Sequence, residues 1–182
     1  MDRSRTLLAA LLAFAATGLA APAHAADLAT LGCVEEKLDV SARELLLKDV
    51  ERNLAESGTR ATYDPMAVGG VREAAAACGA EHGWSTAAVT AARLYTIAKV
   101  GFPIAQRVLG ERGFDASTLE ELWLALPEDK RNRPLAGPDY EELVKAAVTD
   151  EAMQTRENAE LVSEFFGFLS VMQYSSYDFS QA

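Results

Sequence analysis

The stretch ACGAEHGW, residues 77–84, decides how this chain folds, because it holds a helix end, a turn and the approach to the next helix within eight positions. Gly79 and Gly83 are residues typical of helix C-termini, and Ser85, directly after the stretch, is a favoured N-cap residue. Trp84 is expected to fill the space beneath the turn. The stretch therefore predicts a structural corner rather than a reactive site.

The N-terminus of the chain indicates export. A short basic start with Arg3 and Arg5 leads into an apolar run that ends in small residues, Ala23-His24-Ala25. This is the pattern of a secretory signal peptide that is cleaved after Ala25. We therefore assign residues 1–25 as a signal peptide and expect the mature protein in the periplasm. No later stretch predicts a membrane span, because the best one, LVSEFFGFLSVMQY at 161–174, is short and contains Glu164.

The only two cysteines, Cys33 and Cys78, are expected to form a disulfide in an exported protein. A loop of this size stabilises a fold by about 4 kcal/mol in the chain-entropy model. The alternative is a metal site, since Cys78 and His82 are four residues apart on one helical face and Cys33 could be a third ligand. A structural zinc site normally has four ligands, and disulfide-bonded sulfurs cannot act as thiolates. We therefore predict a disulfide, no metal and no cofactor, with His82 as a polar residue at a helix end.

The charge of the chain limits its partners and suggests one candidate binding site. The net charge is -10, and the segment from Phe114 to the end has fourteen acidic residues against five basic ones. Binding to nucleic acid or anionic lipid would need a basic surface, so both are disfavoured. Between Glu81 and Glu111 the only charged residues other than His82 are three bases, which are Arg93, Lys99 and Arg107. They could bind an anionic ligand, but ion pairing with the acidic C-terminal helices is the favoured interpretation.

Helix start and stop signals run through the whole mature chain. Asp27 is expected to cap a first helix. Ser41-x-x-Glu44 and Ser117-x-x-Glu120 match the capping box, in which a hydroxyl and a carboxylate satisfy backbone N–H groups at a helix start. Asp64-Pro65 predicts another start, although Gly69-Gly70 could delay the regular helix to about Val71.

Stop signals divide the rest of the chain. Gly58 is expected to end the helix that begins near Ser41, and Gly101-Phe102-Pro103 to kink or end the long apolar helix that Ser85 opens. Two further helices are expected near 139–148 and 150–173. Over residues 159–173 the apolar side chains fall on one arc of the second helix, which predicts its buried face.

These patterns predict an all-α, single-domain, irregular helical bundle of about six to eight helices with one disulfide. The domain is expected to cover residues 26–174, with an aromatic C-terminal tail at 175–182.

No catalytic residue is predicted. Glu120-Glu121 and Glu141-Glu142 are adjacent pairs, so their side chains point about 100° apart on a helix and cannot face each other across a substrate. The chain also lacks the common nucleotide-binding, zinc-protease and nucleophile-elbow motifs.

The aromatic end of the chain is the candidate partner-binding surface. Its residues are either core or interface, since aromatic side chains are favoured in both; they are Phe166, Phe168, Tyr174, Tyr177 and Phe179. We therefore expect an exported, non-enzymatic protein that binds another periplasmic protein or a second copy of itself. The alternatives are a small anionic-ligand binder using Arg93, Lys99 and Arg107 and, less favoured, an enzyme of unknown reaction.

The export assignment predicts the N-terminus of the mature protein. When the full chain is expressed in a Gram-negative host, the periplasmic fraction should contain protein whose first residue is Ala26, as N-terminal sequencing would report. Protein that keeps residues 1–25, or that stays in the cytoplasmic fraction, would contradict the assignment.

Overall fold

The computed structural model describes residues 25–56 and 60–182, and every regular element in these two ranges is a helix. The chain begins with the 3-10 helix η1 (Leu28–Thr30) and continues through α-helices and a second 3-10 helix, in the order α1 (Cys33–Lys37), α2 (Val40–Ala55), α3 (Pro65–His82), α4 (Thr86–Glu111), α5 (Ala116–Leu124), α6 (Glu128–Arg131), α7 (Gly137–Ala147), η2 (Glu151–Met153) and α8 (Arg156–Gln181). The all-α prediction is confirmed. The predicted signal peptide up to residue 24, and the predicted helix stop at Gly58, lie outside the described residues.

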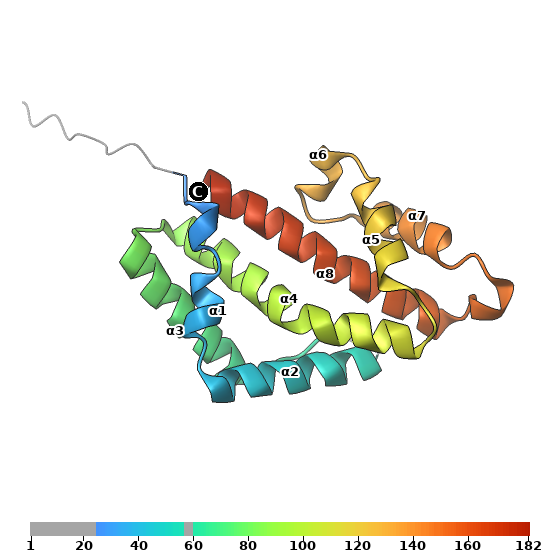
Figure 1. The fold of residues 1–182 in the computed structure, drawn as a ribbon, viewed down its shortest axis with the longest axis horizontal. Coiled ribbons are helices and arrows are strands. Elements are labelled where there is room, and N and C mark those ends of the chain that lie inside the picture. The colour runs from blue at the N-terminus through green and yellow to red at the C-terminus, as the bar shows by residue number, and fades with distance from the viewer. Residues whose placement is uncertain (1–24, 57–59) are drawn as a thin grey trace, which may run out of the picture.

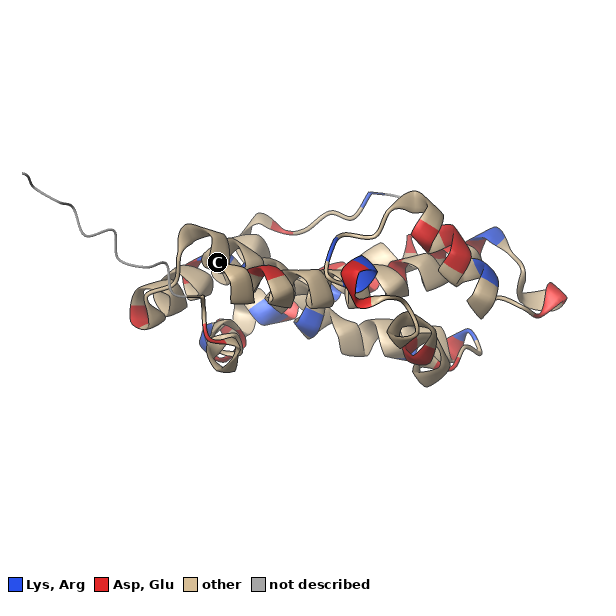
Figure 2. Cartoon of the chain, turned by 90° about the horizontal axis from the view of Figure 1, so that it is seen from above, with Lys and Arg blue, Asp and Glu red and all other residues tan. Residues whose placement is uncertain are grey.

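The two longest helices, α4 and α8, run antiparallel and form the most extensive helix pair in the described chain (Figure 1). Helices α2 and α3 pack against each other and against α4, while α5 and α7 pack together and against α8. The described chain starts beside the end at which α8 finishes (Figure 1). The part of the chain from Phe114 to the end, which holds α5, α6, α7, η2 and α8, has fourteen of the 27 acidic residues, and Figure 2 shows how the acidic and basic residues are distributed along the described chain.

The core forms where the apolar faces of these helices meet. The predicted buried face of α8 is confirmed, because Val162, Phe165 and Phe166 are fully buried. Phe165 stacks on Phe102 of α4 with a centroid separation of 5.3 Å. Small residues on α3 and α4, such as Ala75 and Ala92, are also fully buried. They let the helix backbones approach closely, which larger side chains would prevent.

The predicted capping boxes are shifted in the structure. The N-cap of α2 is Asp39 and that of α5 is Asp115, so neither Ser41 nor Ser117 caps its helix. In each case the aspartate accepts hydrogen bonds from both the backbone N–H and the hydroxyl of the serine two residues later. An ionised carboxylate is a stronger acceptor than a hydroxyl, so the aspartate takes the cap position and the serine becomes its donor.

Two other helix boundaries also differ from the sequence prediction. Helix α3 begins at Pro65 without delay, and Gly70 lies inside it, where the helix passes close to Ala42 of α2. Helix α4 continues through Pro103 instead of ending there. Pro103 is exposed while Gly101 and Ala105 on either side of it are buried. Proline has no backbone N–H, so the hydrogen bond that α4 loses at Pro103 lies on its solvent side. Packing of the opposite side against α8 keeps the helix continuous.

The N-terminal helix is likewise shorter than expected. Asp27 does cap a helix, but it is η1, and its side chain accepts from the N–H of Ala29. A separate helix, α1, then begins at Cys33.

Gly101 of α4 lies close to side chains of both α2 and α8. A Cβ atom at this position would be 2.9 Å from both Phe168 and Val50. Gly101→Ala should therefore destabilise the protein by about 1–3 kcal/mol through overpacking, although alanine is the better helix former. Urea denaturation followed by circular dichroism would measure the change.

Gly110 provides a control on the same helix, since a Cβ atom there meets nothing within 4 Å. Gly110→Ala should be neutral or stabilise the protein by up to about 1 kcal/mol. Equal effects of the two substitutions would contradict the close approach at Gly101.

Candidate functional site

The corner predicted at residues 77–84 is present. Helix α3 ends at His82, and Gly83 has the left-handed conformation with φ of 69° that glycine adopts most easily. The N–H of Trp84 donates to the carbonyl of Gly79 at 2.9 Å, which completes a Schellman motif. Ser85 then caps α4 by accepting from the N–H of Ala88. The corner is thus built by backbone and cap geometry, as the sequence indicates.

Three distant parts of the chain meet at this corner. Cys33 of α1 and Cys78 of α3 form a disulfide that links positions 45 residues apart. The indole N–H of Trp84 donates to the hydroxyl of Thr30 at 3.1 Å. The Trp84 ring also makes an edge-to-face contact with Phe179 of α8, with centroids 4.8 Å apart. The N-terminal segment, the α3–α4 turn and the end of α8 are therefore fastened at one place.

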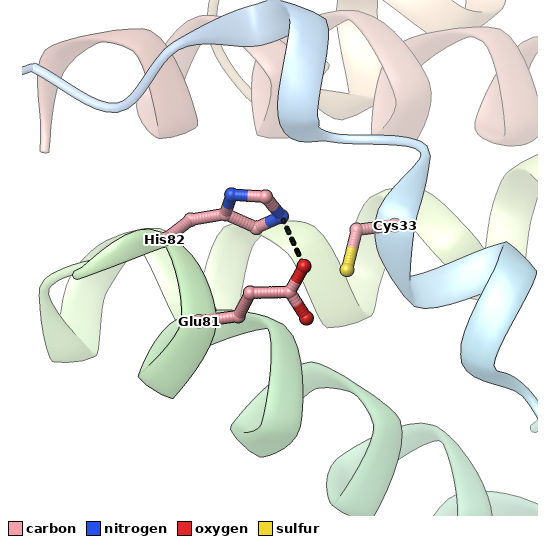
Figure 3. A group of neighbouring side chains, drawn as sticks. All are labelled: Cys33, Glu81 and His82. Atoms are coloured by element: carbon pink, nitrogen blue, oxygen red, sulfur yellow. Dashed lines mark ion pairs between the residues drawn. The ribbon is translucent and has the colours of Figure 1, made fainter.

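Cys33, Glu81 and His82 form the one group of three metal-ligating residue types that lies close together in residues 25–56 and 60–182 (Figure 3). Their potential ligand atoms are all within 4.8 Å of one another. The carboxylate of Glu81 is held on its other side by Lys37, at 2.8 Å, and this ion pair and hydrogen bond lower the pKa of Glu81. Cys33, Cys78 and His82 are the metal ligands that the sequence offers as the alternative to a disulfide. Glu81 was missed, although its position next to His82 could have suggested it.

The three bases considered as an anion site do not converge. All of them lie on α4, where Arg93 and Arg107 are separated by about 21 Å along the axis and Lys99 points about 120° away from Arg93. Arg107 instead pairs with Glu51 of α2 at 2.6 Å and with Glu111 of its own helix at 2.7 Å. Hydrogen bonds to these two carboxylates raise the pKa of Arg107. The expected ion pairing thus occurs at Arg107, but with α2 and α4 rather than with the C-terminal helices.

The aromatic end is part of helix α8, not a separate tail, because α8 continues to Gln181. Phe166 and Phe179 are fully buried, so neither can contact a partner at the surface of this conformation. The other three candidates remain accessible: Phe168 and Tyr174 are partly buried, and Tyr177 is 41% exposed. Burial of Phe179 was missed because its partner, Trp84, is far away in the sequence.

Phe168 lies in a hollow between α2, α4 and α8, which we call the apolar groove. Its volume is about 430 Å³, and most of its lining is apolar. The residues that line it are Val50, Asn53, Leu54, Ala61, Tyr63, Leu94, Ile97, Ala98, Glu164, Gly167, Phe168 and Val171. Leu94 remains 39% exposed. Part of the apolar surface of α4 thus lines the groove instead of packing in the core.

Hydrogen bonds to α2 hold one wall of the apolar groove, the segment before α3. The side-chain amide of Asn53 donates to the carbonyl of Thr62 at 3.0 Å and accepts from its N–H at 3.2 Å. The buried carboxylate of Asp49 accepts from the N–H of Asp64 at 2.6 Å. Because these bonds fix the backbone on both sides of Tyr63, its ring is held in position at the groove.

Two carboxylates lie near Tyr63 of the apolar groove: Glu164, which lines it, and Asp49, which pairs with Arg52 at 2.6 Å. Burial raises the pKa of Tyr63, and the nearby charges of Asp49 and Glu164 raise it further, against the effect of a hydrogen bond with Asn53. A phenolate would be disfavoured here by both carboxylates.

A second hollow, of about 510 Å³, lies between η1, α4, α5 and α8. It has the exposed Leu28 and Leu124 at its edges, but Glu120, Gln173 and Ser176 give it a more polar lining. The apolar groove is therefore the better candidate for a site that binds an apolar group.

Comparison with known proteins adds no identification, since no protein-family model, curated protein or solved structure matches the chain. In the described part of the chain, no helix has both the length and the hydropathy needed to cross a membrane.

The contact between Trp84 and Phe179 generates a prediction. Phe179→Ala should lower the free energy of unfolding by about 3–5 kcal/mol, because it removes a fully buried ring. Tyr177→Ala, two residues away and 41% exposed, should cost less than about 1 kcal/mol. Thermal and urea denaturation of both variants would measure the difference, and a Phe179→Ala variant as stable as Tyr177→Ala would show that the end of α8 is not docked.

Proposed function

We propose that this chain is an exported, non-enzymatic protein that binds a partner protein in the apolar groove, and that the partner inserts a large apolar side chain flanked by lysine or arginine. The observation that carries the proposal is the groove itself, because it contains Phe168 from the candidate binding residues together with the exposed Leu94. An exposed apolar hollow of this kind is characteristic of binding sites rather than of an ordinary surface.

The size and shape of the groove support a protein segment as the ligand. A volume of about 430 Å³ can accept one or two large side chains, the way in which grooves on helical proteins take the anchors of an amphipathic helix. Three helices and the fixed segment before α3 form its walls, so little ordering would be needed on binding. A preformed site loses less conformational entropy when it is occupied.

The electrostatics support basic residues in the partner. The chain has a net charge of -10, and the one charged residue among the described residues that line the groove is the acidic Glu164. Complementary charge speeds association and excludes acidic competitors. A basic, amphipathic segment therefore fits the groove better than an acidic segment with the same apolar face.

The proposal predicts charge-selective peptide binding. A fluorescent helical peptide with a Leu/Phe face and a Lys/Arg face should bind to the mature protein, as measured by anisotropy, and binding should weaken as salt screens the charges. A peptide with the same apolar face and a Glu face should bind much more weakly. Leu94→Asp should reduce the affinity for the basic peptide at least about tenfold, equivalent to about 1.4 kcal/mol.

Leu124→Asp is the matched control, since Leu124 is also an exposed leucine but lines the second hollow. It should leave the affinity unchanged. Equal binding of the basic and acidic peptides, or equal loss in the two variants, would contradict the proposal. Binding of a small apolar dye to the groove without any binding of either peptide would show instead that the groove takes a small molecule.

A further inference from the structure

We propose that reduction of the Cys33–Cys78 disulfide turns the corner into a binding site for a zinc-type divalent ion, with Cys33, Cys78, Glu81 and His82 as its four ligands. The disulfide form and the metal form would then be two alternative links between α1 and α3. The proposal is independent of the apolar groove.

The geometry of the group carries the inference. Cys78 and His82 are four residues apart on α3, so their side chains project from the same helical face. Cys33 faces them from α1, and its sulfur lies within 4.8 Å of ligand atoms of both Glu81 and His82 (Figure 3). With metal–ligand bonds of about 2.0–2.3 Å, the ligand atoms of a tetrahedral site are about 3.3–3.8 Å apart. The sulfur of Cys78 is not among these atoms, but it is bonded to that of Cys33 at 2.08 Å. Breaking that bond would leave both sulfurs beside Glu81 and His82, where side-chain rotations would bring the four ligand atoms to that spacing.

The ligand chemistry suits zinc. Two thiolates and an imidazole are ligands that Zn²⁺ favours, and a carboxylate oxygen completes many of its sites. The carboxylate of Glu81 is suitably placed, because Oε2 pairs with Lys37 at 2.8 Å while Oε1 faces His82 at 3.9 Å. One oxygen could therefore bind the ion while the other keeps its lysine.

In the oxidised protein this site cannot form, because each sulfur is bonded to the other and neither can become a thiolate. Reduction requires a dithiol reductant. Its thiolate attacks the partly exposed sulfur of Cys33, since Cys78 is fully buried, and the Cys33–Cys78 bond breaks with release of the Cys78 thiolate. The second thiol of the reductant then displaces Cys33, so that the reductant leaves as a disulfide and the protein gains two electrons and two protons. Binding of the ion displaces both thiol protons.

The consequence is that the corner keeps a link in either redox state. Glu81 and His82 are exposed, which leaves an entry path for the ion. Because the ion would be held by residues of both α1 and α3, its binding should stabilise the reduced fold by mass action.

The test compares zinc binding by the oxidised mature protein with binding by protein reduced with a phosphine, both in the absence of oxygen. A chromophoric chelator in competition and elemental analysis after gel filtration would measure stoichiometry and affinity. We expect one zinc per reduced chain and none per oxidised chain, with a rise in melting temperature only for the reduced protein. Cobalt in place of zinc should give the charge-transfer absorption of thiolate ligation.

Variants separate a built site from free thiols that bind zinc nonspecifically. His82→Ala and Glu81→Gln should each weaken zinc binding to the reduced protein at least about tenfold. Removing a residue that only orients a metal ligand already lowers metal affinity by about this factor, so removing a ligand should do no less. Glu73→Gln is the matched control, because Glu73 is an exposed glutamate of the same helix outside the group. It should bind zinc like the unmodified protein.

Three results would overturn the proposal. One is the absence of stoichiometric zinc in reduced protein that keeps its helical circular dichroism. Another is unchanged affinity in both His82→Ala and Glu81→Gln. The third is reduced protein that unfolds and does not regain helicity when zinc is added.

Discussion

The structure depends on one covalent constraint, the disulfide between Cys33 and Cys78, together with the Trp84 contacts beside it. Helix α1 has only five residues and η1 only three, lengths at which an isolated helix is not stable in water. These elements are held because the disulfide fixes α1 to α3 and because Trp84 binds Thr30 and packs on Phe179. The corner therefore fixes where the described chain enters the bundle and holds the last turns of α8.

The apolar groove follows from how α4 and α8 are packed on α2. Gly101 allows these helices to approach closely at one point, near Val50 and Phe168. Nearer the start of α4, the larger Leu94 and Ile97 are not fully covered and line the groove instead. The same long, apolar α4 thus supplies part of the core and part of the proposed binding surface. Glu164 of α8 adds one carboxylate to the otherwise largely apolar lining.

The parts of the fold that the sequence predicts correctly are those fixed by local chemistry. Gly83 ends α3 and Ser85 begins α4 through bonds to residues close to them in the sequence. The buried face of α8 follows from the helical spacing of its apolar residues alone. Features that depend on distant residues are harder to predict: α4 does not end at Pro103, and Phe179 is buried against Trp84. The cap shifts at Asp39 and Asp115 show a local competition between acceptors that the capping-box pattern does not weigh. For the candidate sites, composition drew attention to Phe168 and His82, but the groove walls emerge only from tertiary contacts; Glu81 lies next to His82 in the sequence, and only the structure shows that it faces Cys33.

The central claim, that two sulfurs tie the N-terminal segment to the α3–α4 corner in the native protein, can be tested directly by counting free thiols. The chain should be isolated from its native compartment with an alkylating reagent present throughout, denatured, and weighed by intact mass spectrometry. The structure predicts a mass without any alkyl adduct, since both cysteines are bonded to each other. A mass with two adducts would contradict the claim, because the corner would then form without its covalent link.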